Sequence, residues 1–186
     1  MSVTTLMTAE DLLAMPEVPG KRFELVRGEL IEMPGVTALH GDIAGEIYDL
    51  LKAFARLHRL GRVYTDGVGY IVARDPDIVR VPDVSFVASE RVPVEGSPDT
   101  FWPFAPDLAV EVVSTGDPRQ KVYAKVQDYL PGGSHMVWVV WPSTRTVTAH
   151  AADGSVRRYG PDDELDGGDE LPGFRVRVAD LFEIVW

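Results

Sequence analysis

The stretch that decides the fold is PDLAVEVVS, residues 106–114. In an extended chain Leu108, Val110 and Val112 point to one side, while Ala109, Glu111 and Val113 point to the other. Apolar residues therefore line both sides, which is typical of a strand in the middle of a sheet, with cover on both faces. We expect residues 107–113 to form such a central strand.

Glu111 is the exception on this strand, because it is a lone carboxylate among apolar residues. An ionised carboxylate buried without a partner is costly, so Glu111 should meet a cation, a metal ion or a strand end near solvent. The simpler alternative, given equal weight, is that the strand emerges into water near Glu111 and the side chain pairs with an Arg or Lys.

A second carboxylate precedes a neighbouring strand, predicted over residues 83–88. Asp83 follows Pro82 and lies on the face opposite Val84 and Phe86. Taken alone, Asp83 would be read as a solvent-facing residue at a strand start. Taken with Glu111, it would form an oxygen-rich site of the kind that binds Mg²⁺ or Mn²⁺.

The helix predicted over residues 118–130 could bring a cation to this site. Lys121, Lys125 and Tyr129 recur every four residues and share one face. A lysine beside a metal can orient a water molecule or offset charge that develops on a phosphate. The alternative is a pair of solvated lysines on an amphipathic helix.

The rest of the chain reads as short strands with two further helices. Thr8 and Asp11 resemble a capping box that opens a short helix, and apolar residues at three- and four-residue steps predict a long helix over 39–58. Strands are predicted at 22–26, 29–33, 62–65, 68–73, 136–141, 145–151 and 155–159, with an irregular loop at 90–106 and a solvated acidic loop at 162–170. This pattern predicts one α+β domain over residues 1–186.

Composition narrows the function classes. The chain of 186 residues is 45% hydrophobic and 25% charged and has no cysteine, which excludes disulfides, thiolate zinc sites and cysteine nucleophiles. No apolar run approaches the roughly 18 residues of a membrane span, so we expect a soluble cytoplasmic protein.

The net charge of −11 argues against nonspecific coating of nucleic acid, although residues 160–186 hold much of the excess acid.

Several of these segments together resemble a known family. They are Phe23–Leu30 followed by His40, then residues 81–86, residues 106–114, and Lys125 with Tyr129. Their order and spacing are similar to the Uma-type endonuclease family of the PD-(D/E)xK superfamily. The resemblance covers nearly the whole chain, as far as residues 171–174 and 179–182.

The resemblance implies a restriction-endonuclease-like fold, which is a mixed β-sheet flanked by helices, with additional β-hairpins. It also implies Mg²⁺- or Mn²⁺-dependent hydrolysis of phosphodiester bonds in DNA, usually by a homodimer. Asp83 and Glu111 match the metal-binding positions of the family, and Lys125 matches its catalytic lysine. Glu24 and His40 match positions that gather near the same site. Without the resemblance, both would be interpreted as exposed residues.

Two departures favour a different class of function, a nuclease-like module that binds or dimerises without cutting. Val113 stands where the superfamily usually has its lysine, and Lys121 stands where relatives often have an aspartate. The contact surface of such a module would be Phe101, Trp102 and Phe104, if these aromatic residues are exposed. The alternative is that they only cap the core.

One basic stretch keeps two interpretations open. Lys52, Arg56, His58, Arg59 and Arg62 occur with no acid between Asp49 and Asp66. These side chains could contact phosphates, or they could be favoured by the dipole at the C-terminal end of the long helix.

Overall fold

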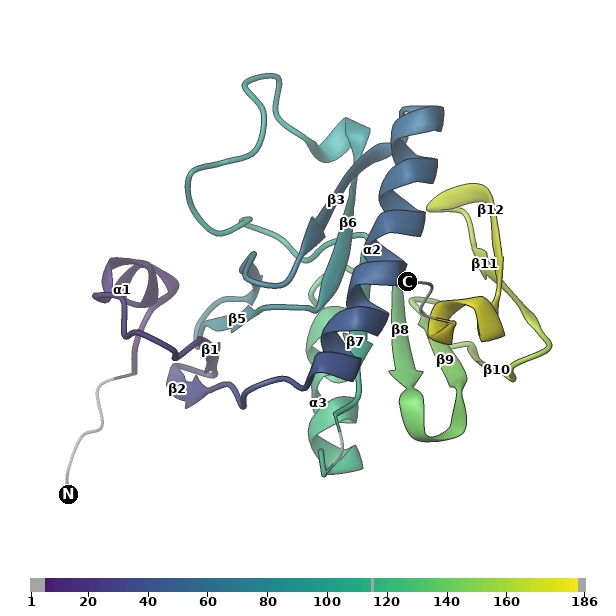
Figure 1. Ribbon diagram of the computed structural model, residues 1–186. Helices are drawn as coiled ribbons and strands as arrows, with labels where there is room; N and C mark the ends of the chain where they lie inside the picture. Colours follow the sequence, from purple (N-terminus) through teal and green to yellow (C-terminus); the bar gives the residue numbers. More distant parts are fainter. Residues whose placement is uncertain (1–5, 115, 184–186) are drawn as a thin grey trace.

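The computed structural model describes residues 6–114 and 116–183, and a six-stranded sheet lies at its centre (Figure 1). The strands follow the order β10-β9-β8-β7-β6-β3. Their bounds are Gly61–Thr65 (β3), Val84–Ala88 (β6), Leu108–Val112 (β7), Met136–Trp141 (β8), Thr146–Ala151 (β9) and Val156–Tyr159 (β10). Since β7 pairs antiparallel with β6 and parallel with β8, the sheet is mixed and β7 is central, as predicted.

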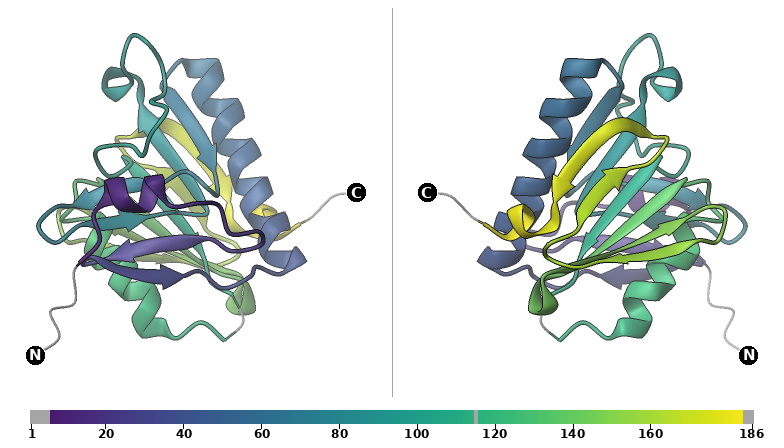
Figure 2. Two further views of the ribbon diagram at one scale, coloured as in Figure 1. Left: turned by 90° about the vertical axis from the view of Figure 1, so that its left-hand side faces the viewer. Right: turned by 90° about the vertical axis from the view of Figure 1, so that its right-hand side faces the viewer.

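Two helices cover opposite faces of this sheet (Figure 2). Val110 and its neighbours on one face of β7 pack against α2 (Ala38–His58), which contributes Ile47 and Leu51. Ala109 on the other face packs in a cluster with α3 (Arg119–Tyr129). The alternation read from residues 107–113 therefore separates two apolar layers, and Glu111 lies on the α3 side.

A smaller four-stranded sheet carries the N-terminal part of the chain. Its order is β2 (Glu29–Glu32), β1 (Phe23–Val26), β5 (Ile78–Arg80) and β4 (Tyr70–Ala73). The turn between β1 and β2 has φ of 52° at Arg27 and 77° at Gly28, the left-handed pair that a tight type I′ hairpin turn needs. Thr8 and Asp11 form the predicted capping box at the start of α1 (Ala9–Ala14).

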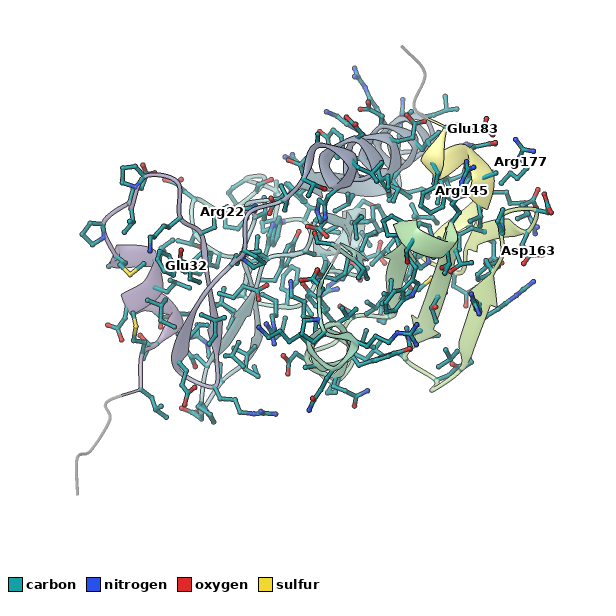
Figure 3. The ribbon with its side chains drawn as sticks, turned by 60° about the horizontal axis from the view of Figure 1, so that its bottom comes forward. Arg22, Glu32, Arg145, Asp163, Arg177 and Glu183 are labelled. Atoms are coloured by element: carbon teal, nitrogen blue, oxygen red, sulfur yellow. The ribbon has the colours of Figure 1, made fainter. Side chains whose placement is uncertain are left out.

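The acidic segment over residues 162–170 is not the solvated loop that the sequence predicted. It holds strand β11 (Glu164–Gly167), which pairs antiparallel with β12 (Leu171–Arg177). Leu165 and Leu171 are fully buried in the α2-side cluster, whereas Asp163 and Arg177 stay at the surface (Figure 3). Burial of these two leucines stabilises the hairpin, while Asp162, Asp163 and Glu164 stay exposed to solvent.

The aromatic residues of the segment predicted as a loop also differ from expectation. Between η1 (Ser89–Arg91) and β7 the chain is largely irregular, as predicted, but Trp102 is 2% exposed and forms an isolated bridge with Tyr70. Phe101 and Phe104 are half-buried against separate apolar clusters. The three residues therefore cap the core and do not form the exposed contact surface proposed for a non-catalytic module.

The remaining elements complete an α+β fold of the predicted class. Two short 3₁₀ turns, η2 (Pro142–Thr144) and η3 (Val178–Phe182), follow β8 and β12. Strand β5 was not predicted, because its three residues are too few to show a pattern. Over residues 6–114 and 116–183, every helix is too short or too polar to cross a membrane.

The core on the α2 side gives a direct test of the packing. Leu51→Ala should lower the free energy of unfolding by about 2–5 kcal/mol, because Leu51 is fully buried. Leu57→Ala on the same helix, where the side chain is 77% exposed, should change it by less than about 0.5 kcal/mol. Urea unfolding of both variants checks this, and equal losses would contradict the assigned helix face.

Candidate active site

A cleft of about 370 Å³ lies where the two sheets meet the start of α2 and one face of α3. All five residues that the sequence analysis proposed for the site line this cleft: Glu24, His40, Asp83, Glu111 and Lys125. Arg22 and Glu32, which lie near each other at the β1–β2 hairpin (Figure 3), also line this cleft. Five elements distant in sequence thus bring their polar side chains to one place.

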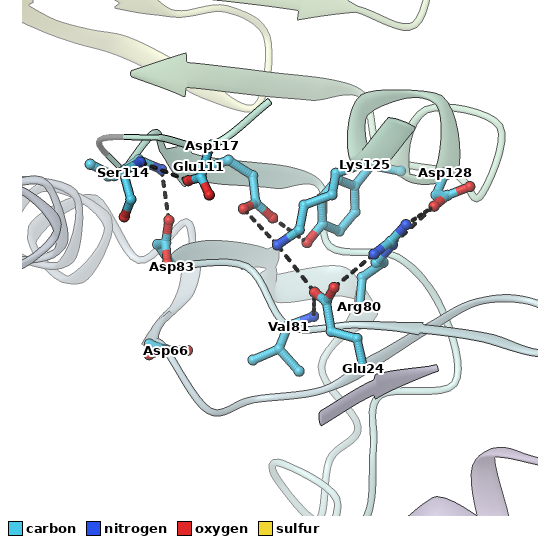
Figure 4. A network of polar contacts seen from close by, with 12 residues as sticks. Glu24, Asp66, Arg80, Val81, Asp83, Glu111, Ser114, Asp117, Lys125 and Asp128 are labelled. Carbon is cyan, nitrogen blue, oxygen red and sulfur yellow. Dashed lines mark hydrogen bonds and ion pairs between the residues drawn. The ribbon is translucent and has the colours of Figure 1, made fainter. Parts of the chain in front are cut away.

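Glu111 lies near the end of β7 and is 7% exposed. Its Oε2 accepts a hydrogen bond from Lys125 Nζ at 2.9 Å, and its Oε1 accepts one from Tyr129 Oη at 2.8 Å (Figure 4). Both donors come from α3, the helix that covers this face of the strand. Both alternatives for Glu111 therefore hold in part, because it is buried and is paired with a lysine.

Lys125 bridges the two sheets. Its Nζ lies 2.9 Å from Glu111 Oε2 and 3.2 Å from Glu24 Oε1 (Figure 4). Glu24 comes from β1 and is 3% exposed, so the default interpretation of a surface glutamate was wrong. Glu24 is buried because β1 lies between β2 and β5, and because its side chain points toward α3, which carries Lys125.

Asp83 is held by the end of β7 and by α2. Its Oδ2 accepts from the backbone amide of Val112 at 2.6 Å, and its Oδ1 lies 3.0 Å from Nε2 of His40. The other ring nitrogen of His40 lies 3.1 Å from Ser114 Oγ. Asp83 and His40 are 7% and 6% exposed, so neither faces solvent as it would if read in isolation.

Sequence reasoning missed Arg80 and Asp128. The Arg80 guanidinium donates to Glu24 Oε2 at 2.7 Å and, through Nε, to Asp128 Oδ2 at 2.9 Å (Figure 4). Arg80 is 6% exposed and stands in the otherwise apolar run Ile78–Val81. Glu111 was identified as a lone charged residue in an apolar run, and the same reasoning could have identified Arg80.

The charges of the site shift the pKa values in opposite directions. Burial raises the pKa of Glu111 to about 7, with the charges of Asp83 and Glu24 adding to the effect and Lys125 opposing it. Burial also acts on Glu24, yet Lys125 and Arg80 outweigh it and lower the pKa of Glu24. Burial disfavours the charged form of Lys125, but Glu111 and Glu24 more than offset it and raise the pKa of Lys125, which stays protonated at neutral pH.

His40 also gains basicity at this site. Desolvation opposes its charged form, but the hydrogen bond and the charge of Asp83 raise the pKa of His40. His40 therefore holds a proton to higher pH than an ordinary histidine does.

The donor set fits a divalent cation of the Mg²⁺ or Mn²⁺ kind. Asp83 and Glu111 offer carboxylate oxygens, which are the ligands that such hard ions prefer. In the network around them, the carboxylates of Glu24, Glu111 and Asp128 pair with Arg80 and Lys125, and that of Asp83 contacts His40. Burial is the main cause of the raised pKa of Glu111, and the charges of Asp83 and Glu24 add to it. A divalent ion bound to this carboxylate would favour its ionised form.

A second group of possible metal ligands lies elsewhere. Among the described residues, Asp107, His135 and Glu170 hold ligand atoms within 4.8 Å of one another. Asp107 precedes β7, so this group lies at the end of the strand opposite Glu111. Oδ1 of Asp107 already pairs with the guanidinium of Arg91, a cation that a metal ion would have to displace.

The two departures from the family pattern have clear positions. Lys121 lines the cleft one turn before Lys125 and is exposed. Lys125, by contrast, is half-buried and pairs with Glu24 and Glu111. Val113, where the superfamily usually has its lysine, also lines the cleft. Lys125 Nζ reaches the Glu111 carboxylate from α3, so a lysine on the helix does lie beside the strand glutamate.

Comparison with known proteins shows the family and the fold of the chain. A protein-family model described as "Putative restriction endonuclease" (Uma2) matches residues 9–179. Among solved structures, the chain is similar to one from Anabaena variabilis described as "a putative nuclease belonging to DUF820", with a TM-score of 0.83 and 22% identity over 95% of this chain and 97% of that one. No curated protein matches the chain. The structural likeness shows the restriction-endonuclease-like fold.

The pKa of Glu111 should respond in opposite directions to two neutralising substitutions. Asp83→Asn should lower it below about 7, because it removes a neighbouring negative charge, and Lys125→Met should raise it, because it removes the stabilising cation. Carboxyl NMR of metal-free protein measures both shifts. Shifts of the same sign would contradict the assigned neighbours.

The raised pKa also has a consequence for stability. The folded-state pKa of Glu111 lies above the ordinary value of 4.5, so this group makes the free energy of unfolding fall as pH rises from about 4.5 to 7. Glu111→Gln should remove that part of the slope, which urea unfolding across this pH range checks.

Proposed function

Because the chain belongs to the family described as "Putative restriction endonuclease", we propose that it is a divalent-metal-dependent nuclease that hydrolyses phosphodiester bonds in DNA. The observation that carries the proposal is the bridge from Glu24 through Lys125 to Glu111, formed in the cleft that Asp83 also lines. The cleft thus holds two carboxylates suited to a metal ion, Asp83 and Glu111, and a lysine that the bridge fixes beside Glu111.

In this proposal Asp83 and Glu111 hold the cation. When bound, Mg²⁺ or Mn²⁺ supplies Lewis acidity at the scissile phosphate. The Val112 amide orients Asp83, and Tyr129 orients Glu111, so both carboxylates are placed before any ion arrives. Glu24 acts here as a positioning residue, because its carboxylate pairs with both cations of the network, Arg80 and Lys125.

Lys125 supplies positive charge where the reaction builds negative charge. During hydrolysis the attacking water gives up a proton to the solvent as its oxygen bonds to phosphorus. The bond from phosphorus to the leaving oxygen breaks, and that oxygen takes up a proton from the solvent. The raised pKa of Lys125 keeps its ammonium charged throughout, so it can stabilise the phosphate or orient the attacking water. Glu24 and Arg80 act on Lys125 as positioning residues, through Glu24 Oε1 and Oε2.

His40 acts on Asp83. Its Nε2 contacts Asp83 Oδ1, so it orients that carboxylate and can hold or release a proton at the cleft.

The non-catalytic alternative loses its proposed contact surface, because Trp102 is buried. A homodimer and a cytoplasmic location stay predictions.

Cleavage assays distinguish the two lysines of α3. With Mn²⁺ and duplex DNA, Lys125→Met should lower the cleavage rate by about 100-fold or more, because it removes the fixed cation at the reacting phosphate. Lys121→Met, one turn earlier on the same helix and exposed, should lower it far less. Glu111→Gln should abolish the metal-dependent cleavage. Full cleavage by purified Glu111→Gln would overturn the proposal.

Metal binding can be measured without knowing the substrate. Calorimetry should detect Mn²⁺ binding to the wild type and not to Glu111→Gln, and the affinity should rise from pH 6 to pH 8, because Glu111 with a pKa of about 7 must lose its proton to bind the ion. His135→Gln, which alters the other possible ligand group, serves as the matched control and should bind as the wild type does. If only His135→Gln loses Mn²⁺ binding, the ion binds at Asp107, His135 and Glu170, and the assignment to Asp83 and Glu111 is wrong.

A further inference from the structure

A second depression, the basic groove, lies between the C-terminal half of α2 and the edge strand β3. It has a volume of about 600 Å³ and is lined by Lys52, Arg56 and Arg59 from α2 and its end, by Arg62 and Tyr64 from β3, and by Tyr48. The four cations are exposed, and the two tyrosines are half-buried. The groove therefore presents a surface of a single sign of charge.

These cations have no acidic partners. Across residues 6–114 and 116–183, no carboxylate lies within ion-pair distance of Lys52, Arg56, Arg59 or Arg62. Lys52 donates instead to Tyr48 Oη at 2.6 Å, and Arg62 donates to Ser97 Oγ at 3.0 Å. In a chain with a net charge of −11, four clustered cations without a counter-charge indicate a polyanionic partner.

The helix dipole explains only part of this cluster. Arg56 and His58 lie in the last turn of α2, where a cation is favoured without any ligand. Arg62 lies on the neighbouring strand, outside the helix, and still faces the same groove. Convergence from two elements is what a groove for phosphates needs, and the tyrosines beside the cations add ring surface of the kind found in nucleic-acid grooves.

The basic groove and the cleft share two structural elements. Helix α2 carries His40 at the cleft, and at 1.5 Å per residue it places Lys52 about 18 Å and Arg56 about 24 Å further along. Tyr64 of β3 lines the groove, and Asp66, directly after β3, pairs with Arg22, which lines the cleft. Strand β3 and α2 lie side by side (Figure 1), and the groove is lined by residues of both.

We propose that the basic groove binds backbone phosphates of the same DNA whose scissile phosphate occupies the cleft, about five to seven base pairs from the cut at 3.4 Å per base pair. The inference rests on the proposed function and adds to it. Contacts of this kind carry no sequence information, but they fix the position and direction of the duplex. They also explain how a chain with so much acid could hold DNA, since four of its 18 Lys and Arg side chains line one groove.

The test compares two double variants that remove the same charge. Arg56→Gln/Arg59→Gln alters the groove, whereas Arg157→Gln/Arg158→Gln alters exposed arginines of β10, at the opposite edge of the same sheet. Both are made in a Glu111→Gln background, and binding of a labelled 24-base-pair duplex is measured over a range of salt concentrations. The groove variant should bind about tenfold more weakly at low salt. Its slope of log affinity against log salt should shrink by about 0.9 for each phosphate that the variant no longer neutralises, with no change in the β10 variant.

Three outcomes overturn the inference. Equal losses in both variants would show a general charge effect. An unchanged salt slope in the groove variant would place the phosphates elsewhere, and a change of oligomeric state instead would assign the groove to an acidic surface of a second copy. Lys52→Gln provides a second, single-site variant with the same expected direction.

Failure of the inference is distinguishable from failure of the proposed function. Metal-dependent cleavage by the wild type tests the function by itself. If the wild type cleaves DNA while the groove variant keeps the full salt slope, only the groove assignment fails.

Discussion

The Lys125 ammonium lies between two buried carboxylates, Glu24 on the small sheet and Glu111 on the large one. Each of these charges would be costly to bury alone, and removing one partner of a buried pair leaves the other uncompensated. The pairing therefore constrains three elements at once, namely β1, β7 and α3. These ion pairs link the small sheet to the large one, together with the apolar cluster in which Tyr70 and Ile78 pack with Ala109.

The same constraint produces the chemistry of the cleft. Burial and the neighbouring acids hold Glu111 near its protonation midpoint at neutral pH, while Lys125 stays charged. Perturbed titration of this kind, in a cleft and with identifiable partners, is typical of functional sites. Arg80 extends the network by joining Glu24 to Asp128 on α3, so the lysine is held from two directions.

Much of the site could be predicted because its signals are local. Glu111 is conspicuous on an apolar strand, and residues 118–130 show which face of their helix carries Lys125. Glu24 could not be identified from its own surroundings, because Phe23 and Leu25 only show that it points the other way. Its burial comes from Arg80 and Lys125, which are far away in sequence. The β11–β12 hairpin escaped prediction for a similar reason, since Leu165 and Leu171 bury against α2 and the acids around them dominate the local pattern.

The sequence by itself determined the central strand, the two covering helices, the fold class and the residue types of the site, because alternation and helical spacing are properties of neighbouring residues. Only the tertiary structure decided which polar residues are buried together, and it did so for Glu24, Arg80 and Asp128. Whether a charged side chain is solvated or paired depends on what packs against it from other parts of the chain. Such partners cannot be read from the residues beside it in the sequence.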